Sequence, residues 1–429
     1  MKIIGVTAPS TGSGKTTVSL AITHALENSV SIKVGPDYID PIVTRASTGH
    51  DTYNMDRWIQ GRNYRDRIDL LSLNHSYAVV EGVMGFYDSG STMNVSTEYY
   101  FSRLKIPYIL VVDVSKLAES AYHMARGFIN RRCVGVVINN YFGDRHLSMV
   151  QQEFLRHGIR IVGRIPHDAG LAIEERHLGL NVESGKERMK QVAPRVAEHL
   201  DMEFIERSAA EYVPRRRVVP PGQSCGPLRI AVAYDDAFSF YYASSLDFLS
   251  RHGQVTFFSP IANQSVPDAD MIYIGGGYPE MHSDRLEQSA GTKEWILAHH
   301  ESGRPIIAEC GGLMYLMDTI AMNGARHGMV GLFHGVVNWE KKVTIGYTRL
   351  RCDRASVMFR KGDTVMGHEY HYSTISTDLD PSLTNVIGKG INGKDGLTDG
   401  NAFASYSHFD LQRYGERVIR SALRASKDK

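Results

Sequence analysis

The chain has 429 residues, more than a single hydrophobic core usually organises, so two domains are expected. Its 48 Lys and Arg residues are balanced by 47 Asp and Glu residues, and we therefore expect neither nucleic acid nor an anionic membrane as a partner. No run of 18 apolar residues and no signal-peptide pattern occurs. The four cysteines are scattered without a Cys-x-x-Cys pair, which fits a cytoplasmic protein and not a disulfide or zinc framework.

Short apolar runs alternate with helical patterns in the first half of the chain. Continuous apolar, β-branched runs are typical of strands in a parallel sheet that is covered on both faces. A helical period over 16–27 follows the first run. The alternation predicts a doubly wound α/β domain, with strands at 2–8, 31–35, 77–83, 108–114 and 134–140.

The pattern dissolves over 206–227, where prolines and a basic triplet indicate a linker. Strand signals return at 228–234, 254–260, 271–277 and 305–310, which predicts a second α/β unit. The expected organisation is a first α/β domain over 1–205, a linker over 206–227 and a second domain over 228–429.

The stretch "TAPSTGSGKT" at 7–16 resembles a phosphate-binding loop of the pattern G-x-x-x-x-G-K-[ST], with Pro9 in place of the first glycine. It follows a predicted strand and opens a predicted helix, which is the context that the motif requires. Gly12 and Gly14 supply backbone freedom beside the phosphates, Lys15 would reach the outer phosphates, and the Thr16 hydroxyl would bind Mg²⁺. A Gly-Ser turn without a ligand is the weaker alternative.

Two acidic clusters follow predicted strands. "KVGPDYIDP" places Lys33, Asp37 and Asp40 after the second strand, and "EGVMGFYD" places Glu81 and Asp88 after the third. Ligands of open α/β sheets bind at these strand ends, so both clusters are expected to face the phosphate loop. The alternative is that these carboxylates only form turns and helix caps.

In "PIIAECGGLMYL" an apolar strand leads into Cys310, two glycines and a helical pattern. A sharp turn of this kind exposes a nucleophile, and the next backbone N–H can stabilise an oxyanion. A second glycine-rich turn, "GGGYPE" at 275–280, could add donors. His408 is the candidate base, with Asp410 as a candidate orienting group. Alternatively, Cys310 is a small core residue.

"GHEYHY" at 367–372 contains His368, Glu369 and His371. The spacing is loose for a metal site, and a polar pocket or an interdomain role is the favoured interpretation.

The chain resembles the cobyrinate a,c-diamide synthases, which are glutamine-dependent enzymes of corrin biosynthesis. Beyond the stretches above, the resemblance rests on "ERHLGL" 175–180, "AFSFYY" 237–242 and "FFSP" 257–260, in the family's order. It implies a dethiobiotin-synthetase-like P-loop domain of parallel α/β type, followed by a class I glutamine amidotransferase domain.

The resemblance also implies residue roles. Cys310 would be the glutaminase nucleophile and His408 its base. Asp37, Asp40, Glu81 and Asp88 would act in metal binding, substrate placement and handling of an activated carboxylate, with Thr16, Asp37 and Glu81 as the Mg²⁺ ligands. Asn139 would contact the adenine ring. The full set of residues that would contact ATP is Gly12, Ser13, Gly14, Lys15, Thr16, Thr17, Lys33 and Asn139.

The implied reaction is ATP-dependent amidation of the a and c carboxylates of cobyrinate, with glutamine or ammonia as nitrogen source. A histidine that the family carries soon after "DYIDP" is absent here, and "IGYTRL" (345–350) keeps only the Gly-Tyr of a longer motif. Nickel-sirohydrochlorin, amidated on the way to coenzyme F430, therefore stays open as the substrate. Cobyric acid synthase and a P-loop switch protein are weaker alternatives. The assembly is left open, with a homodimer as one option.

Overall fold

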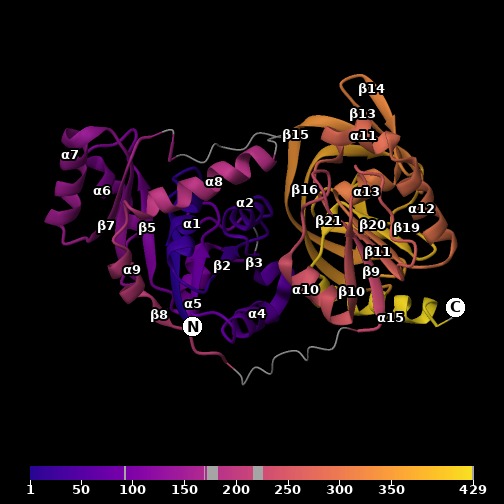
Figure 1. Cartoon of the computed structure of the whole chain (residues 1–429), viewed down its shortest axis with the longest axis horizontal. Coiled ribbons are helices and arrows are strands. Elements are labelled where there is room, and N and C mark those ends of the chain that lie inside the picture. The colour runs from indigo at the N-terminus through magenta and orange to yellow at the C-terminus, as the bar shows by residue number, and fades with distance from the viewer. Residues whose placement is uncertain (91–92, 169, 172–181, 216–225, 428–429) are drawn as a thin grey trace. The chain divides into compact units, whose positions relative to one another are not determined.

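The computed structural model describes residues 1–90, 93–168, 170–171, 182–215 and 226–427. It divides the chain into two compact units (Figure 1): Met1–Arg57 with Arg62–Pro220, and Trp58–Gly61 with Pro221–Lys429. The motif at 175–180 and residues 216–225 of the predicted linker lie outside the described residues. The exact domain boundaries at 205 and 228 remain a prediction.

The first unit is built on one sheet with strand order β3-β2-β4-β1-β5-β6-β7, in which every neighbouring pair is parallel. All five predicted strands are present, whereas β3 and β7 were not predicted. An eighth strand pairs antiparallel with β1. The strands are β1 (Lys2–Thr7), β2 (Ser29–Val34), β3 (Thr52–Met55), β4 (Tyr77–Glu81), β5 (Tyr108–Asp113), β6 (Cys133–Tyr141), β7 (Ile161–Pro166) and β8 (Ala210–Glu211).

Helices pack on this sheet through their apolar residues. Val18, Ala21 and Ile22 of α1 share one buried cluster with Ile4 and Val6 of β1, which fixes the helix directly behind the loop that joins the two elements. The helices are α1 (Lys15–Ala25), α2 (Ile39–Thr48), α4 (Tyr64–Leu71), α5 (Thr97–Leu104), α6 (Ser120–Ala125), α7 (Gly143–Arg156), α8 (Val182–Ala197) and α9 (Met202–Ser208). Within the described parts of the chain, no helix is long and apolar enough to cross a membrane.

Ordered structure extends into the segment that the sequence marks as a linker. Helix α9 ends at Ser208, and β8 pairs Ala210 with Ile3 and Glu211 with Lys2. The sequence gives no sign of this two-residue strand, since residues 206–211 have no hydrophobic period. The strand is held by backbone pairing and not by an apolar face.

The second unit contains two sheets. The first has the order β10-β9-β11-β12-β20-β19 and is parallel except at β19. Its four leading strands were predicted, and it consists of β9 (Leu228–Ala233), β10 (Gly253–Phe258), β11 (Met271–Ile274), β12 (Ile306–Glu309), β19 (Leu397–Asp399) and β20 (Ala402–Ser405). The helices of this unit include α10 (Ala243–His252), α11 (Ser283–Gln288), α12 (Ala290–Glu301), α13 (Gly311–Leu316), α14 (Leu411–Tyr414) and α15 (Glu416–Ala425).

The second sheet has the order β14-β13-β15-β16-β21, with β17 on β15 and β18 on β17. Its long strands β15 and β16 pair antiparallel and place residues 367–372 in a sheet, not in a loop. The strands are β13 (Met317–Met322), β14 (Ala325–Gly328), β15 (Phe333–Cys352), β16 (Thr364–Ser376), β17 (Leu383–Ile387), β18 (Lys394–Asp395) and β21 (Ser407–His408).

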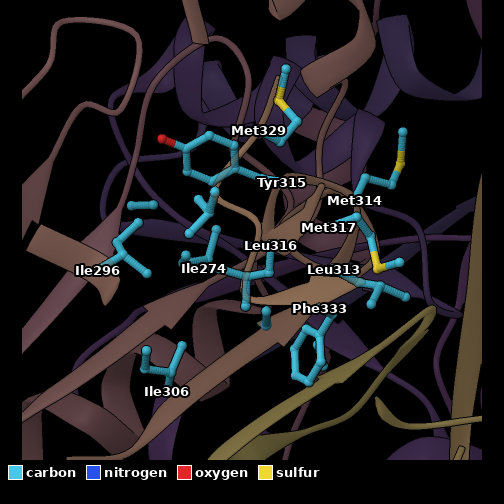
Figure 2. Close-up of a cluster of buried hydrophobic side chains, with 14 of the residues drawn as sticks. Ile274, Ile296, Ile306, Leu313, Met314, Tyr315, Leu316, Met317, Met329 and Phe333 are labelled. Carbon is cyan, nitrogen blue, oxygen red and sulfur yellow. The ribbon is translucent and has the colours of Figure 1, made fainter. Parts of the chain in front are cut away.

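A buried cluster holds helix α13 in place (Figure 2). Leu313, Tyr315 and Leu316 of the helix share this cluster with Ile274 of β11 and Ile306 of β12. Burying a large apolar side chain stabilises a fold by about 1.5–3 kcal/mol. The turn that precedes α13 is therefore anchored by the core on its helical side.

Four residues from the first half of the sequence complete the second unit. Trp58, in the short helix α3 (Arg57–Gln60), is buried and donates its indole N–H to the Thr348 carbonyl at 3.0 Å. Arg413 in turn donates to the carbonyls of Trp58 and Ile59 at 3.0 and 2.7 Å. The Trp58 ring also lies 5.5 Å from that of Tyr347.

Candidate functional site

The phosphate-loop motif forms the connection between β1 and α1. Gly12 and Gly14 both have positive φ angles, 79° and 91°, which favour glycine. A β-carbon on Gly14 would lie only 2.3 Å from the Nδ2 atom of Asn139, so a larger residue would displace that side chain. Pro9 leaves the loop intact, since the preceding residue, Ala8, accepts a backbone hydrogen bond from Phe86 at 3.0 Å.

Lys15 folds back over its own loop. Its ammonium donates to the Ser10 carbonyl at 2.9 Å, and burial, with the nearby Lys33 charge, lowers its pKa to about 8. Asn139, at the end of β6, donates its side-chain amide to the Ser13 carbonyl at 3.0 Å. Asn139 thus supports the loop, and its predicted contact with adenine stays a prediction.

Lys33 lies at the centre of the acidic residues. Its ammonium is 2.5 Å from Asp40 Oδ2, 2.7 Å from Glu81 Oε1 and 3.8 Å from Asp37 Oδ2. Burial alone would lower the pKa of Lys33, but the carboxylates of Asp40, Glu81 and Asp37 outweigh it and raise the pKa. Glu81 of the second predicted cluster therefore joins the three residues of the first in one ionic site at the carboxyl ends of β2 and β4.

Glu81 connects this ionic site to the phosphate loop. Its Oε1 accepts from the Thr16 hydroxyl at 2.7 Å, and its Oε2 accepts from Ser19 at 2.8 Å. Asp37 also accepts from the backbone N–H of Ile39 at 2.8 Å, so it stabilises the start of α2 as well. Burial and the adjacent Asp40 carboxylate raise the pKa of Asp37.

Asp88 is placed differently from the other three carboxylates. It is exposed, and its Oδ2 accepts from the Gly85 N–H at 2.9 Å within its own loop. That loop touches the phosphate loop, because a β-carbon on Gly85 would lie 2.4 Å from the Pro9 carbonyl. Asp88 thus shapes the wall beside the phosphate loop and is not bound to Lys33 in the way that Asp40 and Glu81 are.

A cavity of about 460 Å³ lies beside the phosphate loop. Ser10 and Ser13 of the loop line it together with Asp113, Lys116 and Phe128. Sequence reasoning missed these last three residues. The sequence did contain a usable signal for this wall of the cavity. Polar residues follow β5 just as they follow β2 and β4.

We expect Glu81→Gln to reduce ATP-dependent activity by about 100-fold or more, because it removes a charge that holds both Thr16 and Lys33. The measurement is product formation at saturating ATP. Asp69→Asn is the matched control, since Asp69 is also buried and accepts from Tyr212 at 2.6 Å elsewhere in the unit. Equal losses in both variants would mean that general destabilisation, and not the site, explains the effect.

In the second unit, Cys310 forms a sharp turn between β12 and α13. Its φ of 51° is unusual for a residue with a side chain, as expected at a strained nucleophile turn. Its N–H donates to the Ser405 carbonyl at 2.7 Å. A β-carbon on Gly312 would lie 2.3 Å from the Ile274 carbonyl oxygen, which explains the small residue after the turn.

The Cys310 thiol is held in its protonated form. It is buried and donates to the Tyr370 carbonyl at 3.1 Å. Burial and then the charge of Glu280 raise the pKa of the thiol, so a base must remove its proton before it can react. Glu280, in the second glycine-rich turn, is itself buried, and burial raises its pKa to about 7.

His408 lies beside that glycine-rich turn. A β-carbon on Gly276 would be 2.4 Å from the His408 Cε1 atom and 3.1 Å from its Nε2 atom. The next residue, Gly277, has its backbone nitrogen 3.0 Å from the β-carbon position of Gly311. The fold thus brings the histidine, the glycine turn and the Cys310 turn together at the carboxyl ends of β11 and β12.

The Glu309 carboxylate faces His408, with its Oε2 atom 3.4 Å from the Nδ1 atom of the ring. Asp410, the predicted orienting group, accepts from the Gln412 N–H at 2.8 Å and caps α14. Sequence reasoning missed Glu309, although an acidic residue at the end of the apolar run "PIIAEC" was a usable signal.

The residues of "GHEYHY" have structural partners. Glu369 accepts from the backbone N–H groups of Lys389 and Gly390 at 2.8 and 2.9 Å, and His371 stacks on Tyr406 at 3.8 Å. Burial and the neighbouring His408 lower the pKa of His368 to about 3, so it is neutral at physiological pH. No group of three or more His, Cys, Asp or Glu side chains suited to a metal occurs in the part of the chain that the structure describes.

Two family models cover the two units. Residues 4–180 match the CobQ/CobB/MinD/ParA nucleotide binding domain, and residues 229–414 match the CobB/CobQ-like glutamine amidotransferase domain. The chain is 35% identical to the cobyrinate a,c-diamide synthase of Saccharolobus solfataricus over 98% of its own length and 100% of that protein's. The chain belongs to the cobyrinate a,c-diamide synthase family. Other members include the Listeria monocytogenes protein of this name, 36% identical over 95% of this chain and 96% of the relative, and the Picrophilus torridus protein, 33% identical over 98% of both.

Membership of this family confirms the predicted fold class of a P-loop domain followed by a glutamine amidotransferase domain. It also confirms the enzyme class, an amide-forming ligase of the glutamine amidotransferase type. The alternative of a P-loop switch protein is therefore wrong for this chain. The roles of individual residues stay predictions.

Proposed function

We propose that the enzyme uses ATP and glutamine to amidate the a and c side-chain carboxylates of cobyrinate in cobalamin biosynthesis. The observation that carries this proposal is the match along nearly the full length of relatives that bear this name. Its support in the structure is the presence, in one chain, of a phosphate loop joined to an ionic site and of a cysteine turn beside a histidine.

In the first unit, we propose that the backbone of Gly12, Ser13 and Gly14, together with Thr17, holds the phosphates of ATP, and that Lys15 contacts the outer phosphates. Lys15 can exchange the Ser10 carbonyl for a phosphate oxygen, which is a stronger acceptor for an ammonium group. A substrate carboxylate then attacks the γ-phosphorus, which yields an acyl phosphate and ADP. This activation is needed because a carboxylate is a poor electrophile at neutral pH.

The residues around Thr16 fit Mg²⁺. Thr16 and Glu81 present hard oxygen atoms to each other at 2.7 Å, and Asp37 adds a third oxygen ligand in the same ionic site. When bound, Mg²⁺ neutralises charge on the transferring phosphoryl group. Lys33 would hold the carboxylates of Asp40 and Glu81 in place, and Asp88 would contribute to handling of the activated carboxylate.

In the second unit, we propose that His408 takes the thiol proton of Cys310 and that the thiolate attacks the amide carbon of glutamine. Collapse of the tetrahedral intermediate breaks the C–N bond, and the proton on His408 leaves with ammonia. Water then hydrolyses the thioester to glutamate. Ammonia attacks the acyl phosphate, phosphate leaves, and the amide remains.

Nickel-sirohydrochlorin is the second candidate substrate. The observation that keeps it open is the sequence "PIVTRASTGH" at 41–50, in which no histidine follows "DYIDP" before His50. We further propose that the enzyme acts in the cytoplasm, in keeping with three free cysteines among the described residues.

The test is incubation of the full chain with ATP, Mg²⁺, glutamine and one tetrapyrrole, with products analysed by mass spectrometry. We expect cobyrinate to gain two amides and ADP to accumulate in step with them. Amidation of nickel-sirohydrochlorin alone would select the second candidate. Absence of amidation with either tetrapyrrole, from glutamine and from ammonia alike, would contradict the proposed function.

A further inference from the structure

Glu309 is a buried carboxylate directly before the nucleophile. It is the last residue of β12, and only 1% of its surface is exposed. A carboxylate in such a place must have polar partners. Two neutral donors reach it: the Tyr273 hydroxyl at 2.9 Å from Oε2, and the Phe409 backbone N–H at 3.1 Å from Oε1.

The third partner of Glu309 is the imidazole of His408. Its Nδ1 atom lies 3.4 Å from the same Oε2 that Tyr273 contacts, and His408 is fully buried. The opposite edge of the ring, with Nε2, lies against Gly276. The ring is therefore placed between the carboxylate on its Nδ1 side and, on its Nε2 side, the glycine turn that adjoins the Cys310 turn.

This arrangement fixes which nitrogen of His408 can act as the base. A carboxylate can only accept a hydrogen bond, so the Nδ1 atom that faces it carries the hydrogen. The lone pair of the neutral ring then lies on Nε2. When His408 takes the thiol proton, the same carboxylate stabilises the imidazolium that forms. The distance of 3.4 Å is long for a hydrogen bond, but such bonds often tighten only in the complex with substrate.

We propose that Glu309 is the positioning residue of His408, so that the acid of a Cys310–His408–Glu309 triad directly precedes the nucleophile in the sequence. This proposal rests on the proposed glutaminase role of Cys310 and His408. It assigns the role to Glu309 and not to Asp410, because Asp410 uses its carboxylate to cap α14 and to accept from Ser244 at 3.3 Å.

Glu309 also explains why a buried thiol can be used. Burial raises the pKa of Cys310, so the cysteine needs a base that is strong in this apolar setting. The Glu309 carboxylate beside Nδ1 would offset the positive charge that His408 gains when it takes the thiol proton. Its two neutral hydrogen bonds keep the carboxylate in place without neutralising it.

The experiment compares Glu309→Gln, Glu309→Asp and Asp410→Asn in the full chain. We expect Glu309→Gln to lower kcat for glutamine hydrolysis by about 100-fold or more, with little change in KM, because glutamine binding does not need the carboxylate. The acid limb of the pH profile of kcat/KM should move to lower pH, since the imidazolium loses its stabilising charge. Glu309→Asp keeps the charge and should retain more activity than Glu309→Gln.

The thermal unfolding midpoint of the full chain serves as the check on folding, and it should stay near that of the wild type in all three variants. The proposal would be overturned if Glu309→Gln hydrolysed glutamine within a few-fold of the wild-type rate with the acid limb unmoved. A larger loss of glutamine hydrolysis in Asp410→Asn than in Glu309→Gln would also overturn it. If Glu309→Gln does not fold, Glu309→Asp is measured in its place. Its shorter side chain withdraws the carboxylate from His408 Nδ1, so we expect an intermediate loss of kcat, and a kcat and an acid limb equal to those of the wild type would contradict the proposal. Glutamine hydrolysis can be measured without a tetrapyrrole, so failure of the proposed substrate would leave this test intact.

Discussion

Replacement of Cys310 by alanine is expected to abolish glutamine-driven amidation and to preserve the ammonia-driven reaction. Without the thiol no thioester can form, so glutamine cannot release ammonia. In the proposed reaction the acyl phosphate forms in the first unit and needs only free NH₃, which is more abundant at mildly alkaline pH. The measurement is amide formation by the same protein sample with glutamine and then with ammonium salt.

Cys352→Ala is the matched control for this variant. Cys352 is as buried as Cys310, with 1% of its surface exposed, and its thiol also donates to a backbone carbonyl, that of Arg354, at 2.9 Å. It should keep both reactions. Glutamine-driven turnover that survives in Cys310→Ala would refute the nucleophile assignment, whereas loss of the ammonia reaction in a folded sample would show that the two reactions are coupled.

Lys15→Met should eliminate amidation from either nitrogen source while glutamine hydrolysis continues. Methionine fills the space of the lysine stem but removes the charge that would stabilise the transferring phosphoryl group. We expect a loss of about 100-fold or more in ADP formation. Lys2→Met is the control, because Lys2 is an exposed lysine of β1 in the same unit. ADP formation within a few-fold of wild type in Lys15→Met would remove the phosphate loop from the reaction.

The order of strands and helices could be read from the sequence where burial is continuous. The runs behind β1, β4, β5 and β6 are apolar and buried over most of their length, and polar residues stand only near their ends. The second sheet of the second unit escaped prediction. Its strand β15 alternates buried and exposed residues irregularly and includes a register shift between Trp339 and Thr344, so its periodicity is weak.

The candidate residues could be found from the sequence, but their pairing could not. Lys33 and Glu81 are 48 positions apart, and their ion pair depends on β2 and β4 being neighbours in the sheet. Nothing local signals this arrangement. Likewise, Asp410 is near His408 in sequence, whereas Glu309 reaches the histidine only because of how the sheets meet.

The four residues Trp58–Gly61 make the second unit discontinuous in sequence. A fragment that begins at the linker would lack Trp58, which is 2% exposed, and would leave the Thr348 carbonyl and the Arg413 guanidinium without these backbone and indole partners. Cutting the chain once, between the two family domains, therefore does not yield two self-sufficient proteins. Gene fission in this lineage would have to supply the missing tryptophan segment in trans, and a synthetic peptide spanning it should bind to the isolated second half.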